Sequence, residues 1–481
     1  MSRKSPFVNS SLFHVTIRVT FRRIGLLILM IVPMVLPMLS EHPESSTLPG
    51  RVRLITLGCR ANQYESQRTV EMLESAGWTV AEESSPADLC IINTCTVTHD
   101  ADAKARLMVR RLGRENPGAQ IGIMGCATAS NPDQMAALPG VTAVIDSRGD
   151  LATQLQRFGV VSPGNGISRF DQHQRAFLKV QDGCLLDCAY CIIPKVRPKF
   201  GSRPLADILL EARRLVDAGY REIVLTGIHL GHYGLDLSRG LPKDQWTRLW
   251  HLLDALLAIP GGCRFRLSSL DAAEAHPELI ARLAGSPYVA PHVHLCLQSG
   301  SDAVLKRMRR RYTVASYLDR CDRIREALDN PGLSTDIIVG FPGETDADFE
   351  ATLATARAAR FSDIHVFSYS PRRGTDAFTM PDTLPPEIIR ERRLRLESLA
   401  GEMAADYRSS LVGSTLGVVV ESAQDSDWVV GTACRGVKVR LRGSIESLRR
   451  QLVDVVIESS TGDLLTGAYK QTLSRLPLAT V

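Results

Sequence analysis

Three closely spaced cysteines are the residues in this sequence best suited to chemistry. Cys184, Cys188 and Cys191 form a CxxxCxxC pattern on one short loop. Iron-sulfur cubanes are normally held by four cysteine thiolates. A loop with three thiolates can hold three corners of a 4Fe-4S cluster and leave the fourth iron open to another molecule. Zinc is the main alternative, but a structural zinc site needs four closed ligands, and the sequence offers no evident fourth.

Three other cysteines each follow a short apolar run that predicts a buried strand. The runs are residues 52–57, 89–92 and 121–124, and the cysteines are Cys59, Cys95 and Cys126. Helical patterns between the runs, at Tyr64–Ala76 and Ala101–Arg114, give a strand-helix-strand order, which predicts a parallel sheet. The carboxyl ends of parallel strands meet along one edge, where ligands bind, so we expect these cysteines to converge. The alternative is three small buried core residues.

The CxxxCxxC loop itself follows a predicted strand at 176–181. Further strand-like runs occur at 223–226, 265–267, 292–297, 335–339 and 364–367. Six strand-helix units predict a partial barrel, whose active-site groups belong on the loops at the carboxyl ends of the strands. His229, His232, His292 and His294 are possible ligands, although we expect histidines near strands to be structural.

The C-terminal region changes in composition after a charged helical stretch at 386–407. Val, Gly and Thr alternate with period two at 417–421 and 437–441, which predicts a small β domain. A small basic β-barrel is a common nucleic-acid-binding fold. A β cap without an RNA role is the alternative.

Composition limits the classes of protein that fit. A length of 481 residues predicts about three domains. The excess of 57 basic over 52 acidic residues is too small to indicate nucleic-acid binding by itself, so local clusters at 306–311, 390–395 and 435–442 matter more. Such clusters contact phosphates or form solvated helix faces. Eleven cysteines in so long a chain do not resemble a disulfide scaffold.

The first fifty residues pose a separate question. Arginines precede an apolar run at Ile24–Leu39, which is the order of a signal or a short anchor. Pro33 and Pro37 interrupt the run, which is shorter than the roughly 20 residues of a spanning helix. We favour a misassigned start codon, with the true start near Val52, over a targeting segment.

With both cysteine triplets in place, the sequence resembles the radical S-adenosylmethionine (radical SAM) methylthiotransferases. The resemblance runs from about Val52 to Lys470. It implies an α/β fold with an N-terminal open parallel-sheet domain, a central partial (βα)6 radical SAM barrel and a small C-terminal β-barrel of the TRAM type. The implied divisions are an extension at 1–50, the methylthiotransferase N-terminal domain at 51–157, the barrel at 170–400 and the TRAM-like domain at 409–471.

The resemblance also implies a set of site residues and cofactors. Cys184, Cys188 and Cys191 would be catalytic and hold a 4Fe-4S cluster whose open iron binds S-adenosylmethionine. Cys59, Cys95 and Cys126 would hold a second, auxiliary 4Fe-4S cluster that carries the sulfur. The implied cofactor contacts are Tyr190, Thr226, Gly227, Gln298, Asp336 and Gly340.

Short motifs favour one branch of this family, which acts on threonylcarbamoyladenosine in tRNA. They are residues 181–184, 226–231, 298–302, 309–313 and 369–372. The reaction implied is addition of a methylthio group to carbon 2 of N6-threonylcarbamoyladenosine next to the anticodon. That C–H bond has no acidic proton, so acid-base or nucleophilic catalysis has nothing to act on and a radical is needed. The alternatives are isopentenyladenosine tRNA, a ribosomal-protein side chain, and a non-enzymatic RNA-binding iron-sulfur protein.

Two segments depart from the family pattern, at 195–200 and 432–436. Both fall where the family faces its tRNA, so they bear on the substrate and not on the clusters. The partners implied are tRNA, an electron donor such as flavodoxin or ferredoxin, and a sulfur donor. We expect a cytoplasmic monomer with no obligate membrane partner.

Overall fold

The computed structural model describes residues 49–481 apart from 147–148, 163, 165, 172 and 473–481. The apolar run Ile24–Leu39, on which the targeting question depends, lies outside the described residues. Within the described part of the chain, no helix is long and apolar enough to cross a membrane.

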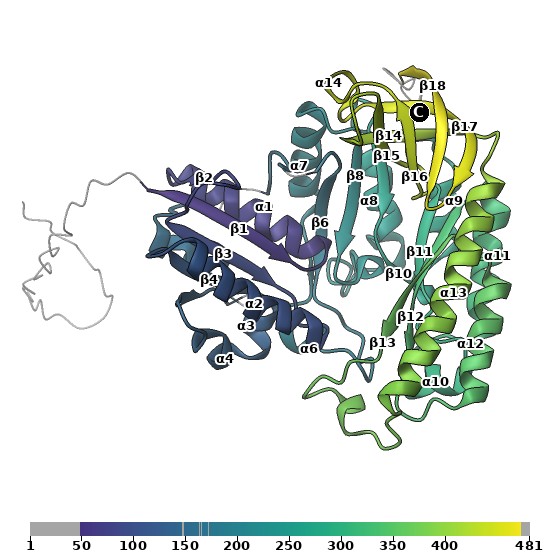
Figure 1. Cartoon of the computed structure of the whole chain (residues 1–481). Helices are drawn as coiled ribbons and strands as arrows, with labels where there is room; N and C mark the ends of the chain where they lie inside the picture. Colours follow the sequence, from purple (N-terminus) through teal and green to yellow (C-terminus); the bar gives the residue numbers. More distant parts are fainter. Residues whose placement is uncertain (1–48, 147–148, 163, 165, 172, 473–481) are drawn as a thin grey trace, which may run out of the picture. The chain divides into compact units, whose positions relative to one another are not determined.

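The N-terminal region is the predicted parallel sheet (Figure 1). In spatial order its strands are β2 (Thr79–Val80), β1 (Arg51–Leu57), β3 (Leu89–Thr94), β4 (Gln120–Gly125) and β5 (Val141–Val144). All six residues of the central strand β3 are buried, because helices cover both faces of the sheet. This explains why β3 is almost continuously apolar in sequence.

Two helices cover opposite faces of this sheet, and the alternation of side chains along β3 serves both. Ile91 packs in one core with residues of α1 (Arg60–Ser75), and Ile92 packs in the other core with residues of α2 (His99–Glu115). The sequence predicted that the first helix begins at Tyr64, but it begins at Arg60. The apolar periodicity starts only at Tyr64, whereas the helix starts directly after the strand turn at Cys59.

The central region is the predicted partial barrel with six principal parallel strands. They are β6 (Ala176–Asp182), β8 (Glu222–Gly227), β9 (Arg264–Leu267), β11 (His292–Cys296), β12 (Gly332–Val339) and β13 (Asp363–Ser368). Short strands β7 (Gly201–Ser202) and β10 (Leu270–Asp271) extend the two sheets that form it. A parallel bridge between Phe265 and Val289 links the sheets.

Helices surround the barrel, and several begin at strong caps. They include α7 (Leu205–Asp217), α8 (Leu249–Leu257), α9 (Pro277–Ala284), α11 (Val314–Ala327), α12 (Asp346–Ala359) and α13 (Pro386–Ser410). Thr313 and Ser316 form a reciprocal capping box at α11, and Thr345 and Asp348 form another at α12. These caps fix where each helix leaves the loop that follows a strand.

The C-terminal region is a closed five-stranded barrel, as the sequence predicted. Its strands are β14 (Thr415–Ala423), β15 (Trp428–Ala433), β16 (Lys438–Arg442), β17 (Leu452–Thr461) and β18 (Leu464–Thr472), in the order β14-β15-β16-β18-β17. Closure removes the unpaired edges that an open sheet would expose. Gly431 is required where β15 crosses β14, because a Cβ atom there would lie 2.3 Å from the carbonyl oxygen of Val419.

A buried charge cluster joins the central barrel to the C-terminal barrel. We call Glu222, Glu421, Arg175, Arg264 and Arg266 the Glu222 cluster. The Glu222 carboxylate is fully buried and pairs with Arg264 at 2.5 Å and Arg266 at 2.8 Å. Arg175 pairs with Glu222 at 3.4 Å and with Glu421 of β14 at 2.6 Å. Burial raises the pKa of Glu222, but the three guanidinium groups outweigh it and hold that pKa far below its usual value.

The substitution Glu222→Gln removes the negative charge that compensates these guanidinium groups. We expect it to lower the free energy of unfolding by about 3–5 kcal/mol, the usual cost of leaving buried charges unpaired. Denaturant titration of the protein would measure this loss. The matched control is Glu350→Gln, which breaks an exposed pair with Arg395 and should cost less than about 1 kcal/mol. Equal losses for the two variants would contradict the assignment.

Candidate active site

The structure brings Cys59, Cys95 and Cys126 to one edge of the N-terminal sheet. Strand pairing aligns Leu57 with Thr94 and Thr94 with Gly125. The three cysteines follow these aligned residues by one or two positions, and neighbouring strands lie about 4.8 Å apart. The convergence that strand order predicted is therefore present in the fold.

Local turns fix how these thiols are presented. Gly125 has φ 95°, and a Cβ atom there would lie 2.3 Å from the Thr94 carbonyl oxygen, so only glycine permits the turn into Cys126. The Cys95 sulfur accepts a hydrogen bond from the backbone N–H of Val97 at 3.5 Å. The Cys59 thiol lies 3.1 Å from Oδ1 of Asn62, to which it donates.

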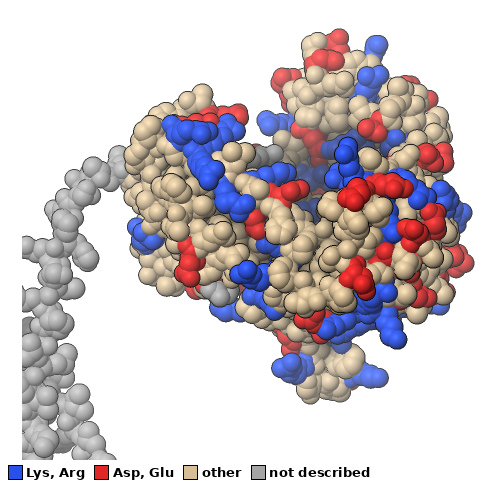
Figure 2. All heavy atoms as spheres, turned by 60° about the horizontal axis from the view of Figure 1, so that its bottom comes forward, with Lys and Arg blue, Asp and Glu red and all other residues tan. Residues whose placement is uncertain are grey.

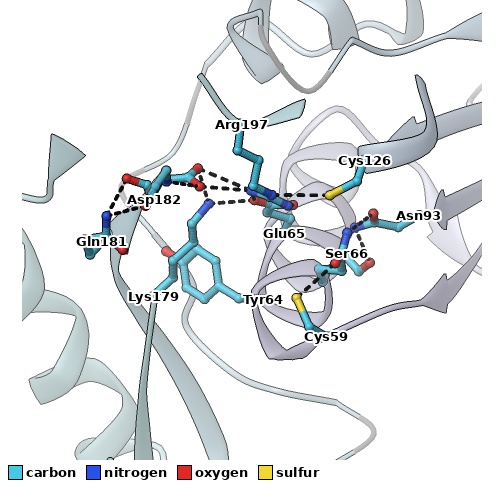
Figure 3. Close-up of polar contacts among 12 residues, drawn as sticks. Cys59, Tyr64, Glu65, Ser66, Asn93, Cys126, Lys179, Gln181, Asp182 and Arg197 are labelled. Carbon is cyan, nitrogen blue, oxygen red and sulfur yellow. Dashed lines mark hydrogen bonds and ion pairs between the residues drawn. The ribbon is translucent and has the colours of Figure 1, made fainter. Parts of the chain in front are cut away.

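Arg197 lies beside the most deeply buried of these thiols (Figure 3). Its Nε donates to Cys126 Sγ at 3.4 Å. Burial raises the pKa of Cys126 to about 11, and the nearby guanidinium opposes that shift. Ligation of a metal by Cys126 would require deprotonation of this buried thiol.

The same guanidinium belongs to an ion network with Glu65, Lys179 and Asp182 (Figure 3). Arg197 binds Glu65 through two nitrogens, at 2.7 and 2.8 Å, and Asp182 at 3.1 Å. Lys179 binds both carboxylates at 2.6 Å. Asp182 stands two residues before Cys184, so the network ties the surroundings of Cys126 to the start of the CxxxCxxC loop.

The CxxxCxxC loop leaves β6 at Gly183, where φ is 71°. A Cβ atom at Gly183 would lie 2.5 Å from the carbonyl oxygen of Lys199, so the loop passes closely under the following segment. The Cys184 sulfur lies 3.5 Å from Nδ1 of His229. Burial, together with the charges of Cys188 and Cys184, raises the pKa of the Cys191 thiol to about 12.

Among the described residues, the groups whose ligand atoms all lie within 4.8 Å of one another are His229, His232 and Glu274, and His294, Asp336 and His365. Neither group includes a cysteine. In chemical type, soft thiolates are the donor set of an iron-sulfur cluster.

A pocket of about 210 Å³ lies beside the CxxxCxxC loop. Four residues that the sequence indicated for the site line it, namely Tyr190, Cys191, Gln298 and Asp336. Val97 and Thr98, from the loop after Cys95, line it as well. We call this the cofactor pocket. It brings the two cysteine loops to one space.

Three other predicted contacts lie outside the cofactor pocket. Thr226 is buried near the end of β8. A Cβ atom on Gly227 would lie 3.0 Å from Oε1 of Gln181. A Cβ on Gly340 would lie 2.6 Å from Ile389 of α13. At Gly340 the structure therefore shows a packing constraint, and the proposed cofactor contacts of these three residues remain predictions.

Sequence reasoning did not find the basic residues that contact the cysteines. Arg197 contacts Cys126, and Nη1 of Arg310 donates to Cys188 Sγ at 3.3 Å. Arg310 appeared in the sequence only as one of a basic cluster, and Arg197 only within a segment that departs from the family pattern. His229 appeared as a possible ligand of its own. Hydrogen bonds to ligand sulfurs tune such clusters, but no spacing rule locates them in a sequence.

Asp336 connects the cofactor pocket to two histidines on the neighbouring strands, the buried His294 and the exposed His365. Its Oδ1 lies 3.2 Å from Nε2 of His294 and 3.2 Å from Nδ1 of His365. The other ring nitrogen of His365 lies 3.2 Å from Asp363. The hydrogen bonds to Asp336 and Asp363 raise the pKa of His365 to about 10. His365 is therefore an imidazolium at neutral pH.

Comparison with known proteins agrees with this geometry. Residues 178–356 match the Radical SAM superfamily, and residues 51–146 match the family described as Uncharacterized protein family UPF0004. The solved structure of the radical S-adenosylmethionine methyltransferase TsrM from Kitasatospora setae superposes with a TM-score of 0.50 at 14% identity, covering 67% of this chain and 75% of that one. The fold and site thus define a radical SAM enzyme, which implies a 4Fe-4S cluster and S-adenosylmethionine as cofactors.

Curated relatives narrow the class. The chain is 36% identical to the threonylcarbamoyladenosine tRNA methylthiotransferase MtaB of Bacillus subtilis, over 84% of this chain and 92% of that protein. It is 35% identical to the Thermotoga maritima protein of the same name, over 77% and 86%. It is also 36% identical to the tRNA-2-methylthio-N(6)-dimethylallyladenosine synthase of Corynebacterium urealyticum, over 79% and 74%. This chain belongs to the radical SAM methylthiotransferase family.

The substitution Asp336→Asn should lower the pKa of His365 from about 10 toward the ordinary value of about 6.5. A pKa raised by folding means that the ion pair stabilises the fold at pH values below the folded pKa and is lost as the pH rises through about 10. NMR titration of the histidine ring carbons would measure the shift. Asp254→Asn, which removes an exposed partner of Arg282, is the control. An unchanged His365 titration in Asp336→Asn would show that Asp336 does not set the charge of His365.

Proposed function

We propose that this protein adds a methylthio group to carbon 2 of N6-threonylcarbamoyladenosine beside the anticodon of tRNA. The observation that carries the proposal is the cofactor pocket, which residues after Cys95 and within the CxxxCxxC loop line together. A reaction in which a radical activates one substrate carbon and sulfur is then added to it needs the radical source and the sulfur source close to that carbon. The printed names of the Bacillus subtilis and Thermotoga maritima relatives support the same substrate.

We also propose that Cys59, Cys95 and Cys126 hold a second 4Fe-4S cluster. Their positions after three aligned strands and the buried Arg197 beside Cys126 support it. A cationic group near a thiolate offsets the negative charge that cluster ligation concentrates. The sulfur donor that replenishes this site and the flavodoxin- or ferredoxin-like electron donor are further parts of the proposal.

The residues of the cofactor pocket have distinct roles in this proposal. S-adenosylmethionine bound at a cluster on the CxxxCxxC loop would supply the radical chemistry. Tyr190, Gln298 and Asp336 would hold it beside Cys191. Phe367, which is 43% exposed, lines the same pocket and offers an aromatic face for an unpaired purine. Stacking on aromatic side chains is the usual way in which proteins hold such bases.

Contact with tRNA would depend on local basic groups rather than on a uniformly basic face. In Figure 2, Lys and Arg are scattered over the visible face with Asp and Glu between them. On the C-terminal barrel, Arg440 and Arg442 lie 4.8 and 5.4 Å from the ring centre of Trp428. Such a site can combine phosphate contacts with base stacking.

We also keep the predicted division of the chain as part of this proposal. The methylthiotransferase N-terminal domain occupies 51–157, the radical SAM barrel 170–400 and the TRAM-like domain 409–471. The tRNA substrate makes the cytoplasm the expected place of action, and we expect the protein to work as a monomer.

Iron and sulfide analysis tests the two-cluster proposal. Anaerobically reconstituted wild-type protein should contain two 4Fe-4S clusters. The triple variant Cys59→Ala, Cys95→Ala, Cys126→Ala should lose about half of its iron and sulfide, and so should Cys184→Ala, Cys188→Ala, Cys191→Ala. The control is the substitution of Cys90, which is buried in β3 and not part of either triplet. One cluster in the wild type would refute the auxiliary site.

Mass spectrometry of tRNA nucleosides tests the substrate. Deletion of the gene should abolish 2-methylthio-N6-threonylcarbamoyladenosine and leave N6-threonylcarbamoyladenosine in its place. A plasmid copy should restore the product, and a copy with Cys188→Ala should not. Persistence of the methylthiolated nucleoside in the deletion strain would reject this substrate, and loss of the isopentenyl product instead would assign the other tRNA branch.

A further inference from the structure

A second pocket, of about 450 Å³, lies where the central barrel meets the C-terminal barrel. We call it the basic pocket. It is lined by Arg60 of α1, by barrel strands, by α13 and by the loop between β15 and β16. Six Lys or Arg residues line it against two Asp residues. The cofactor chemistry described above uses none of these cationic residues.

Many of these positive charges already have acidic partners. Arg175 and Arg266 belong to the Glu222 cluster, and Arg435 pairs with Asp329 at 3.3 Å. Lys438 pairs with Glu421 at 2.5 Å. These ion pairs fix the walls of the pocket. A ligand could be bound only by hydrogen-bond donors that the pairs do not use.

Arg60 and Arg266 supply donors that remain, and so does the buried Nε of Arg408. In the described part of the chain, Arg60 makes no hydrogen bond or ion pair, and its side chain is exposed along the pocket. Arg266 is only 2% exposed, yet its Nη1 has no hydrogen-bond partner among the described residues. A buried guanidinium nitrogen without an acceptor is costly. Both features indicate a site for an anionic oxygen.

A histidine that lines the same pocket adds a further unpartnered nitrogen. His292 uses Nε2 to contact the Ser334 hydroxyl at 3.2 Å, whereas its Nδ1 is buried without a partner in the part of the chain described. Gly436 approaches the ring so closely that a Cβ atom there would lie 2.6 Å from it. The loop of the C-terminal barrel therefore holds His292 against the pocket.

The basic pocket and the cofactor pocket share strand β13. Asp363 and His365 line the basic pocket, and Phe367 lines the cofactor pocket. Two residues of a strand span roughly 7 Å, and Asp336, which lines the cofactor pocket, is in contact with His365. Arg60 follows Cys59 directly. A purine placed at Phe367 could therefore extend a side group of a few atoms into the basic pocket.

We propose that the basic pocket binds the carboxylate of the N6-threonylcarbamoyl group and that Arg60 is a specificity-determining residue. This inference rests on the proposed function. The threonyl end of that group carries a carboxylate, which matches a guanidinium in charge and geometry. An isopentenyl group has no charge and would leave the buried donors unpaired. Sites built to pair a polar group reject analogues that lack it far more strongly than apolar pockets discriminate between shapes.

The space in the pocket agrees with this assignment. Ala400, Gly401 and Ala404 of α13 line it, and a Cβ atom on Gly401 would meet nothing within 4 Å. The segment 432–436, which departs from the family pattern in sequence, supplies part of the opposite wall. Small side chains on one wall and fixed charges on the other suit a short polar group.

A phosphate of the RNA backbone is the other source of an anionic oxygen at this pocket. The two sources differ in one respect that can be controlled, because an anticodon stem-loop keeps its phosphates whether or not adenosine 37 carries the threonylcarbamoyl group. Three synthetic stem-loops therefore serve as probes, with the threonylcarbamoyl group, its methyl ester and unmodified adenosine. Fluorescence anisotropy with the cluster-loaded protein measures the dissociation constant of each.

Wild-type protein should bind the threonylcarbamoyl stem-loop roughly 10- to 100-fold more tightly than either neutral probe, the range for hydrogen bonds to a charged group. Arg60→Gln should reduce that ratio to less than about threefold and leave binding of unmodified RNA unchanged, and Arg60→Lys should restore part of it. Arg213→Gln, on the exposed face of α7, is the matched control. Iron content and circular dichroism confirm that each variant is folded and loaded.

Two results would overturn the inference. Equal weakening of all three probes by Arg60→Gln would assign the guanidinium to backbone phosphate. Equal binding of the acid and its methyl ester by the wild type would remove the carboxylate from recognition, and this arm needs no variant to fold. Failure of the proposed function would show itself differently, as unchanged methylthiolation of tRNA in the deletion strain. If the deletion strain loses the methylthiolated nucleoside but the wild-type protein binds all three stem-loops equally, only the carboxylate site is rejected.

Discussion

Burying a guanidinium between two cysteine-bearing loops is the constraint on which the rest of the site depends. Arg197 is only 6% exposed, and it contacts Cys126, Glu65 and Asp182 from one position. A charge so deeply buried is tolerated only when its partners are held in place. The N-terminal region supplies Glu65 and Cys126, and the barrel supplies Asp182, so the two regions must pack in one arrangement to satisfy it. That arrangement also sets the distance between the two cysteine triplets.

The parts of this structure that follow from local pattern could be predicted from sequence. Parallel strands end along a common edge, so the positions of Cys59, Cys95 and Cys126 after three apolar runs were sufficient to predict their convergence. A one-residue error in a predicted strand end does not change this prediction, because all three cysteines still lie at the same edge of the sheet. The six strands of the barrel and the small β domain followed from alternation and composition in the same way. The start of α1 was predicted too late. The helix begins at Arg60, directly after Cys59, whereas the apolar periodicity that marks a helix in the sequence starts only at Tyr64.

The contacts that tune the site could not be predicted, and the reason is physical. Arg197 approaches Cys126 from 71 positions further along the chain, and Arg310 approaches Cys188 across 122 positions. Such contacts depend on the final packing of whole regions, and no periodicity or local spacing encodes them. The same holds for the Glu222 cluster, in which Arg175 of the barrel and Glu421 of the C-terminal barrel meet only after both have folded. An arginine in a sequence does not reveal whether it faces solvent or a buried carboxylate.

The distribution of charge inside the barrel explains why one scaffold can serve different substrates in this family. The end of the barrel near the cysteines presents thiols and the aromatic face of Phe367, which suit a cofactor and a purine common to all of its tRNA substrates. The opposite end is charged, since Glu222 neutralises only part of the positive charge of Arg175, Arg264 and Arg266. In the proposal above, chemistry at carbon 2 takes place at the first end, and the N6 substituent, which leaves the purine at carbon 6, is recognised at the second. Under that proposal, selection can change at residues that line the second end while Tyr190, Gln298 and Asp336 stay at the first.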